Sequence, residues 1–312
     1  MLKTPVLFLI FNRPNVTTHV FEEIKKQKPK HLYVAGDGPR NKQEEILCDE
    51  ARKIATNIDW DCEVKTLFRE SNLGCQQAVY KAITWFFENE EEGIIVEDDC
   101  LPSESFWTYC EQLLAKYRDD KRVMHISGET QIAENLTEDS YYFSRIPHIW
   151  GWASWKRAWA KYDVGMNDYP DFVKKKKIKS IFKNSYHQSD WQKILKQMYD
   201  KKIDTWDYIW CYTLFNNDGF SIIPNKNLVS NIGFGENSTH TSEITELANK
   251  PLSEIDLILK HPEKTQIDEE IQHRVLNERY NMPDSFSFER HKTLKIIIRE
   301  TERALHKAGL KK

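Results

Sequence analysis

The sequence predicts an α/β fold in which a mixed, mostly parallel sheet is flanked by helices. Three short apolar runs in the first seventy residues are each followed by an amphipathic stretch long enough for a helix. A fourth apolar run then ends abruptly in three carboxylates. Strands that alternate with helices in this way form parallel sheets, because each connection must return across a face of the sheet.

The first strand is expected at residues 4–11, which are almost entirely apolar. A polar turn at 12–15 follows, and residues 16–26 place apolar side chains on one side of a predicted helix. Arg13 would then lie at the carboxyl end of a strand and near a helix N-terminus, where a diphosphate binds favourably. The alternative is an ordinary surface arginine in a turn.

The second strand, at residues 31–35, is followed by Asp37 between two glycines. At this strand end Asp37 either accepts hydrogen bonds from a nucleotide base or ribose, or belongs to a common Asp-Gly turn. The remaining elements predicted for these units are a helix at 42–57, a strand at 62–68 and a helix at 75–87.

Glu97, Asp98 and Asp99 directly follow the fourth apolar run, 94–96, which reads as a buried strand. Side chains alternate along a strand, so Glu97 and Asp99 are expected on one face and Asp98 on the other. Adjacent anions repel one another unless they are exposed or a cation lies between them. Sheets of this class bind ligands at this edge, and Mg²⁺ or Mn²⁺ prefers carboxylate oxygens. The alternative is a solvated acidic turn ending an edge strand.

The second half of the chain mixes further elements with an aromatic block. We expect helices at 106–117 and from 204 onward, strands at 122–128 and 220–224, and a solvated basic helix around 174–177. The block at 141–159 is interpreted as a mixture of sugar-facing wall and core, with Trp155 and Trp159 in the core at helical spacing.

Two polar positions in this half are candidates for chemistry. Asp207 opens a predicted helix, where the helix dipole favours a carboxylate whatever its function. The same carboxylate could be a general base that removes a proton from an attacking hydroxyl. His240 lies in the Gly- and Asn-rich loop 231–241, which is typical of loops that close over a ligand. It is either a metal or phosphate ligand or an ordinary loop histidine.

Composition excludes several classes of protein. A net charge of -3 over 312 residues gives no signal for nucleic acid. Six cysteines without CxxC spacing argue against a zinc site and a disulfide scaffold, and fit a reducing cytosol. The apolar start is too short for a signal peptide or a membrane span. We expect a cytoplasmic protein whose basic helix at 290–312 packs on the rest of the fold or rests peripherally on an anionic membrane.

The order of these motifs resembles the GT-A glycosyltransferases. The resemblance is strongest to N-acetylglucosaminyltransferase I and to bacterial nucleotide-diphospho-sugar transferases, and it covers roughly residues 4–241. The motifs that carry it are Arg13 after the first strand, Asp37 after the second, the acidic triplet, Gly151 with Trp152, Trp206 with Asp207, and the loop to His240.

The resemblance implies a GT-A fold and a metal-dependent hexosyltransferase or N-acetylhexosaminyltransferase. Such an enzyme moves a sugar from a nucleotide-diphosphate donor, with UDP favoured, to a hydroxyl of a glycan acceptor with inversion, and polysaccharide biosynthesis is the associated process. It implies Asp207 as the catalytic base and Asp99 as the ligand of Mn²⁺ or Mg²⁺. The implied donor contacts are Arg13 at the diphosphate, Asp37 at the base, Glu97 and Asp98 at the sugar and ribose, and also Asn72, Trp152 and His240. The relative's donor-contacting histidine has no clear match, and Gln76 or Gln77 takes its place.

The resemblance ends near residue 241, and beyond residue 242 the chain becomes polar with short helical pieces, so we expect a division there. Residues 1–245 would form the catalytic domain, with a nucleotide-binding part at about 1–100 and an acceptor part at 101–245, and 246–312 a helical C-terminal appendage. Two other functions stay open. A sugar-nucleotide nucleotidyltransferase usually has a Gly-rich basic loop after the first strand, whereas the turn 12–14 has no glycine. A non-catalytic carbohydrate-binding protein would need neither the acidic triplet nor Asp207.

Overall fold

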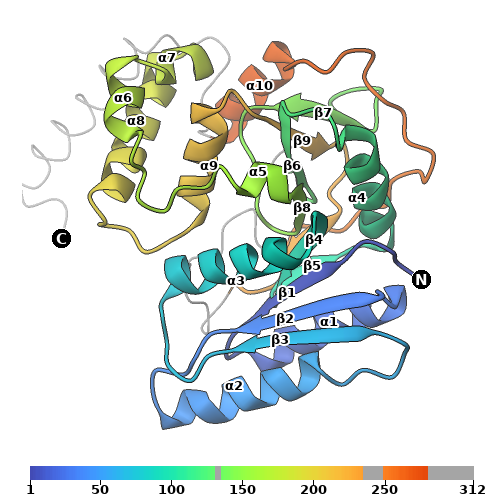
Figure 1. Cartoon of the computed structure of the whole chain (residues 1–312). Coiled ribbons are helices and arrows are strands. Elements are labelled where there is room, and N and C mark those ends of the chain that lie inside the picture. Colours follow the sequence, from blue (N-terminus) through green and yellow to red (C-terminus); the bar gives the residue numbers. More distant parts are fainter. Residues whose placement is uncertain (131–134, 235–248, 280–312) are drawn as a thin grey trace, which may run out of the picture.

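A computed structural model describes residues 1–130, 135–234 and 249–279 (Figure 1). Its centre is an eight-stranded sheet in the order β3-β2-β1-β4-β8-β6-β9-β7. The strands are β1 (Val6–Ile10), β2 (His31–Gly36), β3 (Glu63–Phe68), β4 (Glu92–Glu97), β6 (Val123–Ser127), β7 (Tyr141–Ser144), β8 (Trp152–Trp155) and β9 (Phe220–Pro224). Within this sheet β7 and β8 are antiparallel to the other strands. The predicted mixed, mostly parallel sheet flanked by helices is confirmed.

Three predicted βα units precede β4. Their helices are α1 (Pro14–Gln27), α2 (Lys42–Ala55) and α3 (Cys75–Asn89). The strand registers pair Ile10 with Gly36, Gly36 with Phe68, and Leu9 with Glu97. The carboxyl ends of four parallel strands therefore meet at one edge of the sheet, and the residues that follow each strand are brought together there.

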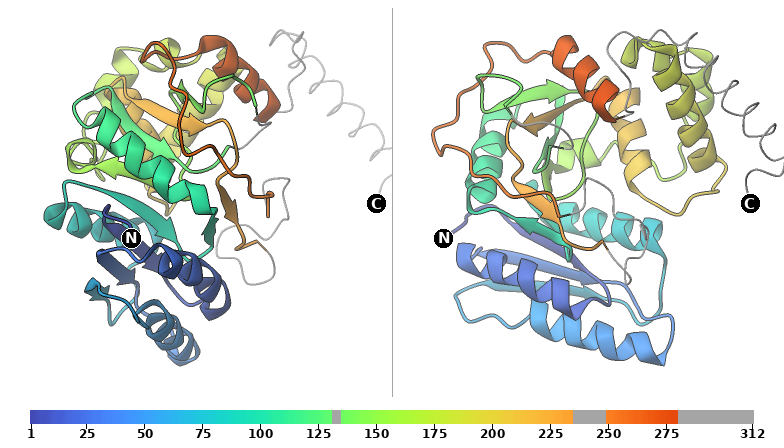
Figure 2. Two further views of the ribbon diagram at one scale, coloured as in Figure 1. Left: turned by 90° about the vertical axis from the view of Figure 1, so that its right-hand side faces the viewer. Right: turned by 180° about the vertical axis from the view of Figure 1, so that it is seen from behind.

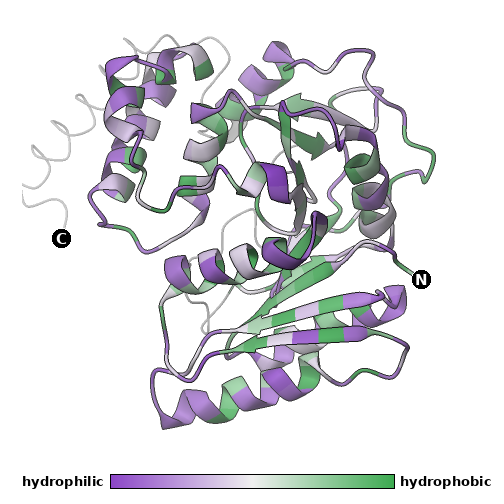
Figure 3. Cartoon of the chain, viewed as in Figure 1, coloured by the Kyte–Doolittle hydropathy of each residue, from purple (hydrophilic) through white to green (hydrophobic). Residues whose placement is uncertain are grey.

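The two faces of the sheet belong to two hydrophobic cores. Along β1, Val6, Phe8 and Ile10 pack toward α1, α2 and α4 (Glu104–Tyr117), whereas Leu7 and Leu9 pack toward α3. This alternation follows from the period of two in a strand. The strands are accordingly among the most hydrophobic parts of the chain, and hydrophilic residues gather on the helices and the connecting loops (Figure 3).

The aromatic block differs from its predicted form. Trp155 ends β8, which lies between β4 and β6, and Trp159 lies on the short helix α5 (Lys156–Trp159). Both tryptophans are buried, so the prediction that they are core residues is confirmed. The helical spacing was wrong, because Trp155 belongs to a strand and Trp159 to a short helix, and the two rings lie in different cores. Within β8, Trp152 likewise lies in one core and Trp155 in the other. A strand with aromatic residues on both faces has no visible alternation.

Several elements were not predicted. A two-stranded sheet pairs β5 (Cys100–Pro102) with β10 (Val229–Asn231). Helices α6 (Tyr169–Lys174), α7 (Ile178–Ile181) and α8 (Ser185–Tyr199) were not predicted in this form either. Helix α9 (Asp207–Asn216), in contrast, confirms the helix expected from residue 204 onward. These four helices gather on one side of the molecule, apart from α1 and α2 (Figure 2). The basic run begins at the last residue of α6 and continues into a turn rather than a helix.

The predicted C-terminal appendage is described in part. Helix α10 (Glu269–Arg279) packs Val275 against Tyr142 and Ile223 beside the sheet. The basic helix predicted at 290–312 lies outside the described residues. Among the helices of the described segments, none has both the length and the hydrophobicity that crossing a bilayer requires.

His125 of β6 provides a test of the core by pH. Its Nε2 donates to the carbonyl of His148 at 2.8 Å, and its Nδ1 accepts from Trp210 Nε1 at 3.0 Å. Complete burial lowers the pKa of His125 from 6.5 to about 3. The imidazole is therefore neutral in the folded protein, and protonation favours the unfolded chain.

We expect the contribution of His125 to the unfolding free energy to be constant above pH 7 and to be lost as the pH falls below 6.5. Between pH 7.5 and 5 this loss amounts to about 2 kcal/mol of unfolding free energy. Urea titrations at several pH values would measure it. Near pH 5, the slope of unfolding free energy against pH should correspond to about one proton fewer taken up on unfolding in His125→Phe than in wild type. Equal slopes in the two proteins would contradict the prediction.

Candidate active site

A cavity of about 460 Å³ lies at the carboxyl edge of the first four strands. This volume is in the range of pockets that bind small molecules. Seven of the ten residues predicted for the site line it: Arg13, Asp37, Asn72, Glu97, Asp98, Asp99 and Asp207. The structure thus joins residues from four strand ends with a carboxylate from α9.

Arg13 lies between two carboxylates of the acidic triplet. Its Nη1 donates to Asp99 Oδ2 at 2.9 Å, and its Nη2 donates to Asp98 Oδ1. The backbone N–H of Phe11 donates to Asp98 Oδ2 at 3.1 Å. Strand β4 ends at Glu97, so Asp98 and Asp99 lie in a turn and both reach one guanidinium. The expected alternation of the three side chains therefore does not continue past Glu97.

Burial and charge oppose each other in this cluster. Burial disfavours the Arg13 guanidinium, but attraction to Asp98 and Asp99 outweighs it and raises the pKa of Arg13. For Glu97, burial and the negative charges of Asp99 and Asp98 raise the pKa to about 8. One oxygen, Glu97 Oε1, is buried without a hydrogen-bond partner. The Asp207 charge also contributes to the raised pKa of Glu97, which places the two carboxylates within electrostatic reach.

The residues fit a divalent cation that is shared with a substrate. Glu97 Oε1 is an oxygen with no partner, and Asp99 offers a carboxylate at the cavity wall. Gly233 lies directly over Asp99 and Arg13, where a side chain would collide with both. Within the described segments, no group of three or more histidine, cysteine or acidic side chains forms a complete cage. Phosphate oxygens of a substrate would have to supply the other ligands, which is common for Mg²⁺.

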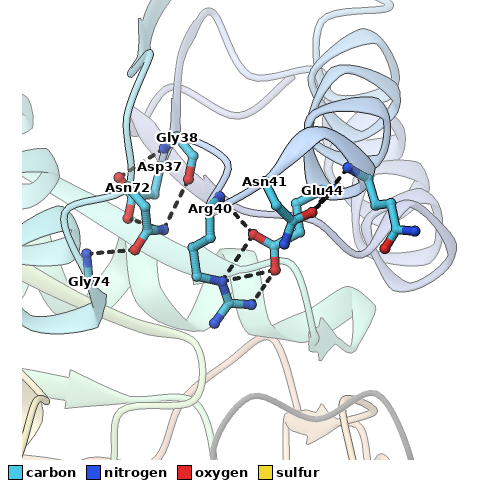
Figure 4. Close-up of polar contacts among 8 residues, drawn as sticks. Asp37, Gly38, Arg40, Asn41, Glu44, Asn72 and Gly74 are labelled. Atoms are coloured by element: carbon cyan, nitrogen blue, oxygen red, sulfur yellow. Dashed lines mark hydrogen bonds and ion pairs between the residues drawn. The ribbon is translucent and has the colours of Figure 1, made fainter.

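Asp37 and Asn72 form one network that joins the turns after β2 and β3 (Figure 4). Asp37 accepts from Asn72 Nδ2 at 2.9 Å, from the backbone N–H of Gly38 at 2.9 Å and from that of Leu73 at 3.0 Å. Asn72 also donates to the carbonyl of Gly38 and accepts from the N–H of Gly74. The carboxylate of Asp37 is thus largely satisfied within the protein, and the pair holds two cavity-forming turns in fixed positions.

Asp207 is positioned by its neighbours in the first turn of α9. Thr205 Oγ1 donates to Asp207 Oδ1. Tyr162 donates to the Trp206 carbonyl at 3.0 Å. The Trp206 ring stacks on that of Trp152 at 5.6 Å. Trp152 is itself fully buried and does not line the cavity, so the structure places it behind the wall rather than in it.

The N-terminus of α3 is tied to the same segment. The backbone N–H of Gln76 donates to Asp204 Oδ1 at 3.1 Å, and its side chain donates to the carbonyl of Thr205 at 3.1 Å. Asp204 therefore satisfies a free N–H group of the helix from another part of the chain. Gln77 does not line the cavity. His240 lies outside the described residues.

The cavity residues that were not predicted as site residues include Arg40, Arg69, Trp150 and Asp204. Arg40 and Arg69 follow the second and third strands as Arg13 follows the first, so the rule that selected Arg13 would also have selected them. Arg40 binds Glu44 and lies over the ring of Phe11. Trp150 and Asp204 belong to irregular segments, and their positions depend on tertiary contacts.

Comparisons with known proteins give distant structural likenesses. No protein-family model matches the chain, and no curated protein matches its sequence. HddC from Yersinia pseudotuberculosis is 11% identical over 49% of this chain and 77% of its own, with a TM-score of 0.31. The 4-diphosphocytidyl-2C-methyl-D-erythritol synthase from Anaerococcus prevotii is 9% identical over 51% and 75%, with a TM-score of 0.29. The glycosyltransferase GlyE of Streptococcus pneumoniae is 10% identical over 70% and 45%, with a TM-score of 0.30.

Proposed function

We propose that this protein is a metal-dependent glycosyltransferase that uses a nucleotide-diphosphate sugar, with UDP favoured, and inverts the anomeric carbon. One observation carries the proposal. A single cavity joins arginines and carboxylates from the ends of the first four strands to Asp207 from α9. The strand ends suit a nucleotide diphosphate, and Asp207 is a separate carboxylate suited to a base.

The two parts of the cavity correspond to two substrates. The donor nucleotide occupies the strand ends within residues 1–100, where Arg13, Arg40 and Arg69 line the wall. The acceptor occupies the side formed by residues 101–245, which includes Asp207. Asp37 and Asn72 position the turns that the nucleotide contacts, because their hydrogen bonds hold these turns together.

The chemistry is a single displacement. Asp207 accepts the proton of an acceptor hydroxyl while that oxygen forms a bond to the anomeric carbon. The bond from the anomeric carbon to the diphosphate oxygen breaks, and its electron pair leaves with the diphosphate. Thr205 holds Asp207 in place, and Arg13 offers positive charge to the leaving group. A divalent cation at Asp99, when bound, would stabilise the same developing charge.

A thermal-shift panel of sugar nucleotides with and without Mn²⁺ tests this proposal. A ligand at a hundred times its Kd stabilises the folded state by about 2.7 kcal/mol, so the melting temperature should rise by several degrees for a UDP-sugar with Mn²⁺. A rise with neutral oligosaccharides alone would favour a carbohydrate-binding protein. Release of pyrophosphate from a nucleoside triphosphate and a sugar 1-phosphate would favour a nucleotidyltransferase instead.

A further inference from the structure

Carboxylates line both sides of the cavity, but its cationic side chains lie on one side only. Three arginines line it, and each follows one of the first three strands: Arg13 follows β1, Arg40 follows β2 and Arg69 follows β3. Among its described lining residues from position 100 onward there is no lysine or arginine. The ionisable side chains on that side are Asp204 and Asp207, both carboxylates. A phosphate or carboxylate group on the acceptor would find no cationic partner there and would face two negative charges.

Trp150 gives that side of the cavity an aromatic surface. It is half-buried, and its ring meets the ring of Phe234 edge-to-face at a centroid distance of 5.7 Å and 81°. Nearby tryptophans, Trp152 and Trp206, are fully buried. Gly151 separates Trp150 from Trp152 at a φ of +63°, and it lies so close to Val229 that a side chain would collide. This turn leaves Trp150 at the cavity while Trp152 enters the core.

We propose that the acceptor, at the sugar ring that carries the reacting hydroxyl, is an uncharged saccharide whose apolar face stacks on Trp150. The inference rests on the proposed function and adds the chemical class of the acceptor. The C–H face of a pyranose matches the flat, partly apolar indole surface. Its hydroxyls are donors, and Asp204 and Asp207 are acceptors at the same wall. An acidic sugar lacks this match because both carboxylates repel it.

Matched glycosides can test this class directly. Saturation-transfer NMR would measure binding of three neutral ligands, the methyl β-glycosides of glucose, galactose and N-acetylglucosamine. It would also measure two acidic ligands, the methyl β-glycosides of glucuronic acid and galacturonic acid. Each measurement is made with and without UDP and Mn²⁺. Each uronide differs from its neutral partner only by the carboxylate at C6. We expect at least one neutral glycoside to bind and its acidic partner to bind about tenfold more weakly or not at all.

Variants at position 150 separate the stacking from the charge. Trp150→Ala should weaken neutral glycoside binding about tenfold, and Trp150→Phe should retain most of it because a flat ring remains. Trp60→Ala removes an indole outside the cavity and should leave glycoside binding unchanged. The affinity for UDP with Mn²⁺ should be the same in all these proteins.

Four results would overturn the inference: equal or tighter binding of the acidic glycosides, no binding by any glycoside, an unchanged affinity in Trp150→Ala, or the same loss in Trp60→Ala. Failure of the proposed function looks different. In that case the wild-type protein would not bind UDP with Mn²⁺, and the glycoside measurements made without nucleotide would still report on Trp150.

Discussion

Asp207→Asn is expected to abolish nearly all sugar transfer while the protein keeps its fold and its affinity for the donor. A general base contributes about a hundred- to ten-thousand-fold to a reaction rate, and an amide cannot accept the proton of the acceptor hydroxyl. The Asn side chain keeps an oxygen that can accept from Thr205 Oγ1, so the contact that positions residue 207 can persist. The expected change is therefore in kcat rather than in donor binding.

Steady-state transfer and calorimetry with UDP and Mn²⁺ would measure the two quantities separately. Asp218→Asn is a matched control, because it makes the same substitution just beyond the other end of α9. Asp218 has a φ of 52°, a conformation that asparagine also tolerates. If the rate of sugar transfer by Asp207→Asn is within tenfold of the wild-type rate, Asp207 is not the general base. A product with the anomeric configuration of the donor would contradict the single displacement.

The first part of the fold, up to the end of β4, could be predicted because its signals are local. Residues 1–97 alternate apolar strands with amphipathic helices, and parallel strands bring their carboxyl ends to one edge whatever the remainder of the chain does. The second half depends on distant partners. β5 and β10 have three residues each and pair across more than a hundred positions, so neither has a pattern of its own. In β8, burial of both faces hides the alternation that marks a strand.

The site shows the same division. Arg13 and the acidic triplet were predicted from their places after strands, and the structure brings Arg13 into contact with Asp98 and Asp99. The bond between Asn72 and Asp37 joins residues whose positions are 35 apart and depends on two adjacent turns. Trp152 could not be separated by sequence from Trp150, although Gly151 sends one to the core and leaves the other at the cavity. A motif of neighbouring aromatics does not tell which ring faces a ligand.

The two hydrogen bonds that Arg13 donates have a consequence for metal binding. Asp99 Oδ2 accepts a hydrogen bond from Arg13 Nη1, and Gly233 covers the pair. A cation that needs this oxygen must compete with a guanidinium that is already in place. A nucleotide diphosphate removes the competition, because it offers Arg13 a different anionic partner. The metal and the nucleotide should therefore bind much more tightly together than the metal binds alone.

Substitution of Arg13 should consequently affect the two affinities in opposite directions. In Arg13→Gln, Mn²⁺ alone should bind about tenfold more tightly than in wild type, because one charged hydrogen bond no longer opposes it. UDP in the presence of Mn²⁺ should bind more weakly, because a cation near the diphosphate is lost. Calorimetry would measure both. In Asp99→Asn, by contrast, the dependence of UDP affinity on Mn²⁺ should disappear.

Stability measurements distinguish this competition from simple damage to the fold. Arg13→Gln leaves Asp98 buried without its guanidinium, and breaking a buried ion pair costs about 3–5 kcal/mol. Mn²⁺ alone should restore part of the lost melting temperature in Arg13→Gln and have little effect on wild type. In Arg13→Lys, which keeps the charge but not the paired N–H groups, the effect of Mn²⁺ on the melting temperature should be intermediate between those in Arg13→Gln and wild type. Asp171→Asn, at an exposed position on α6, should behave as wild type. If Mn²⁺ alone binds wild type and Arg13→Gln equally, Arg13 does not compete for Asp99.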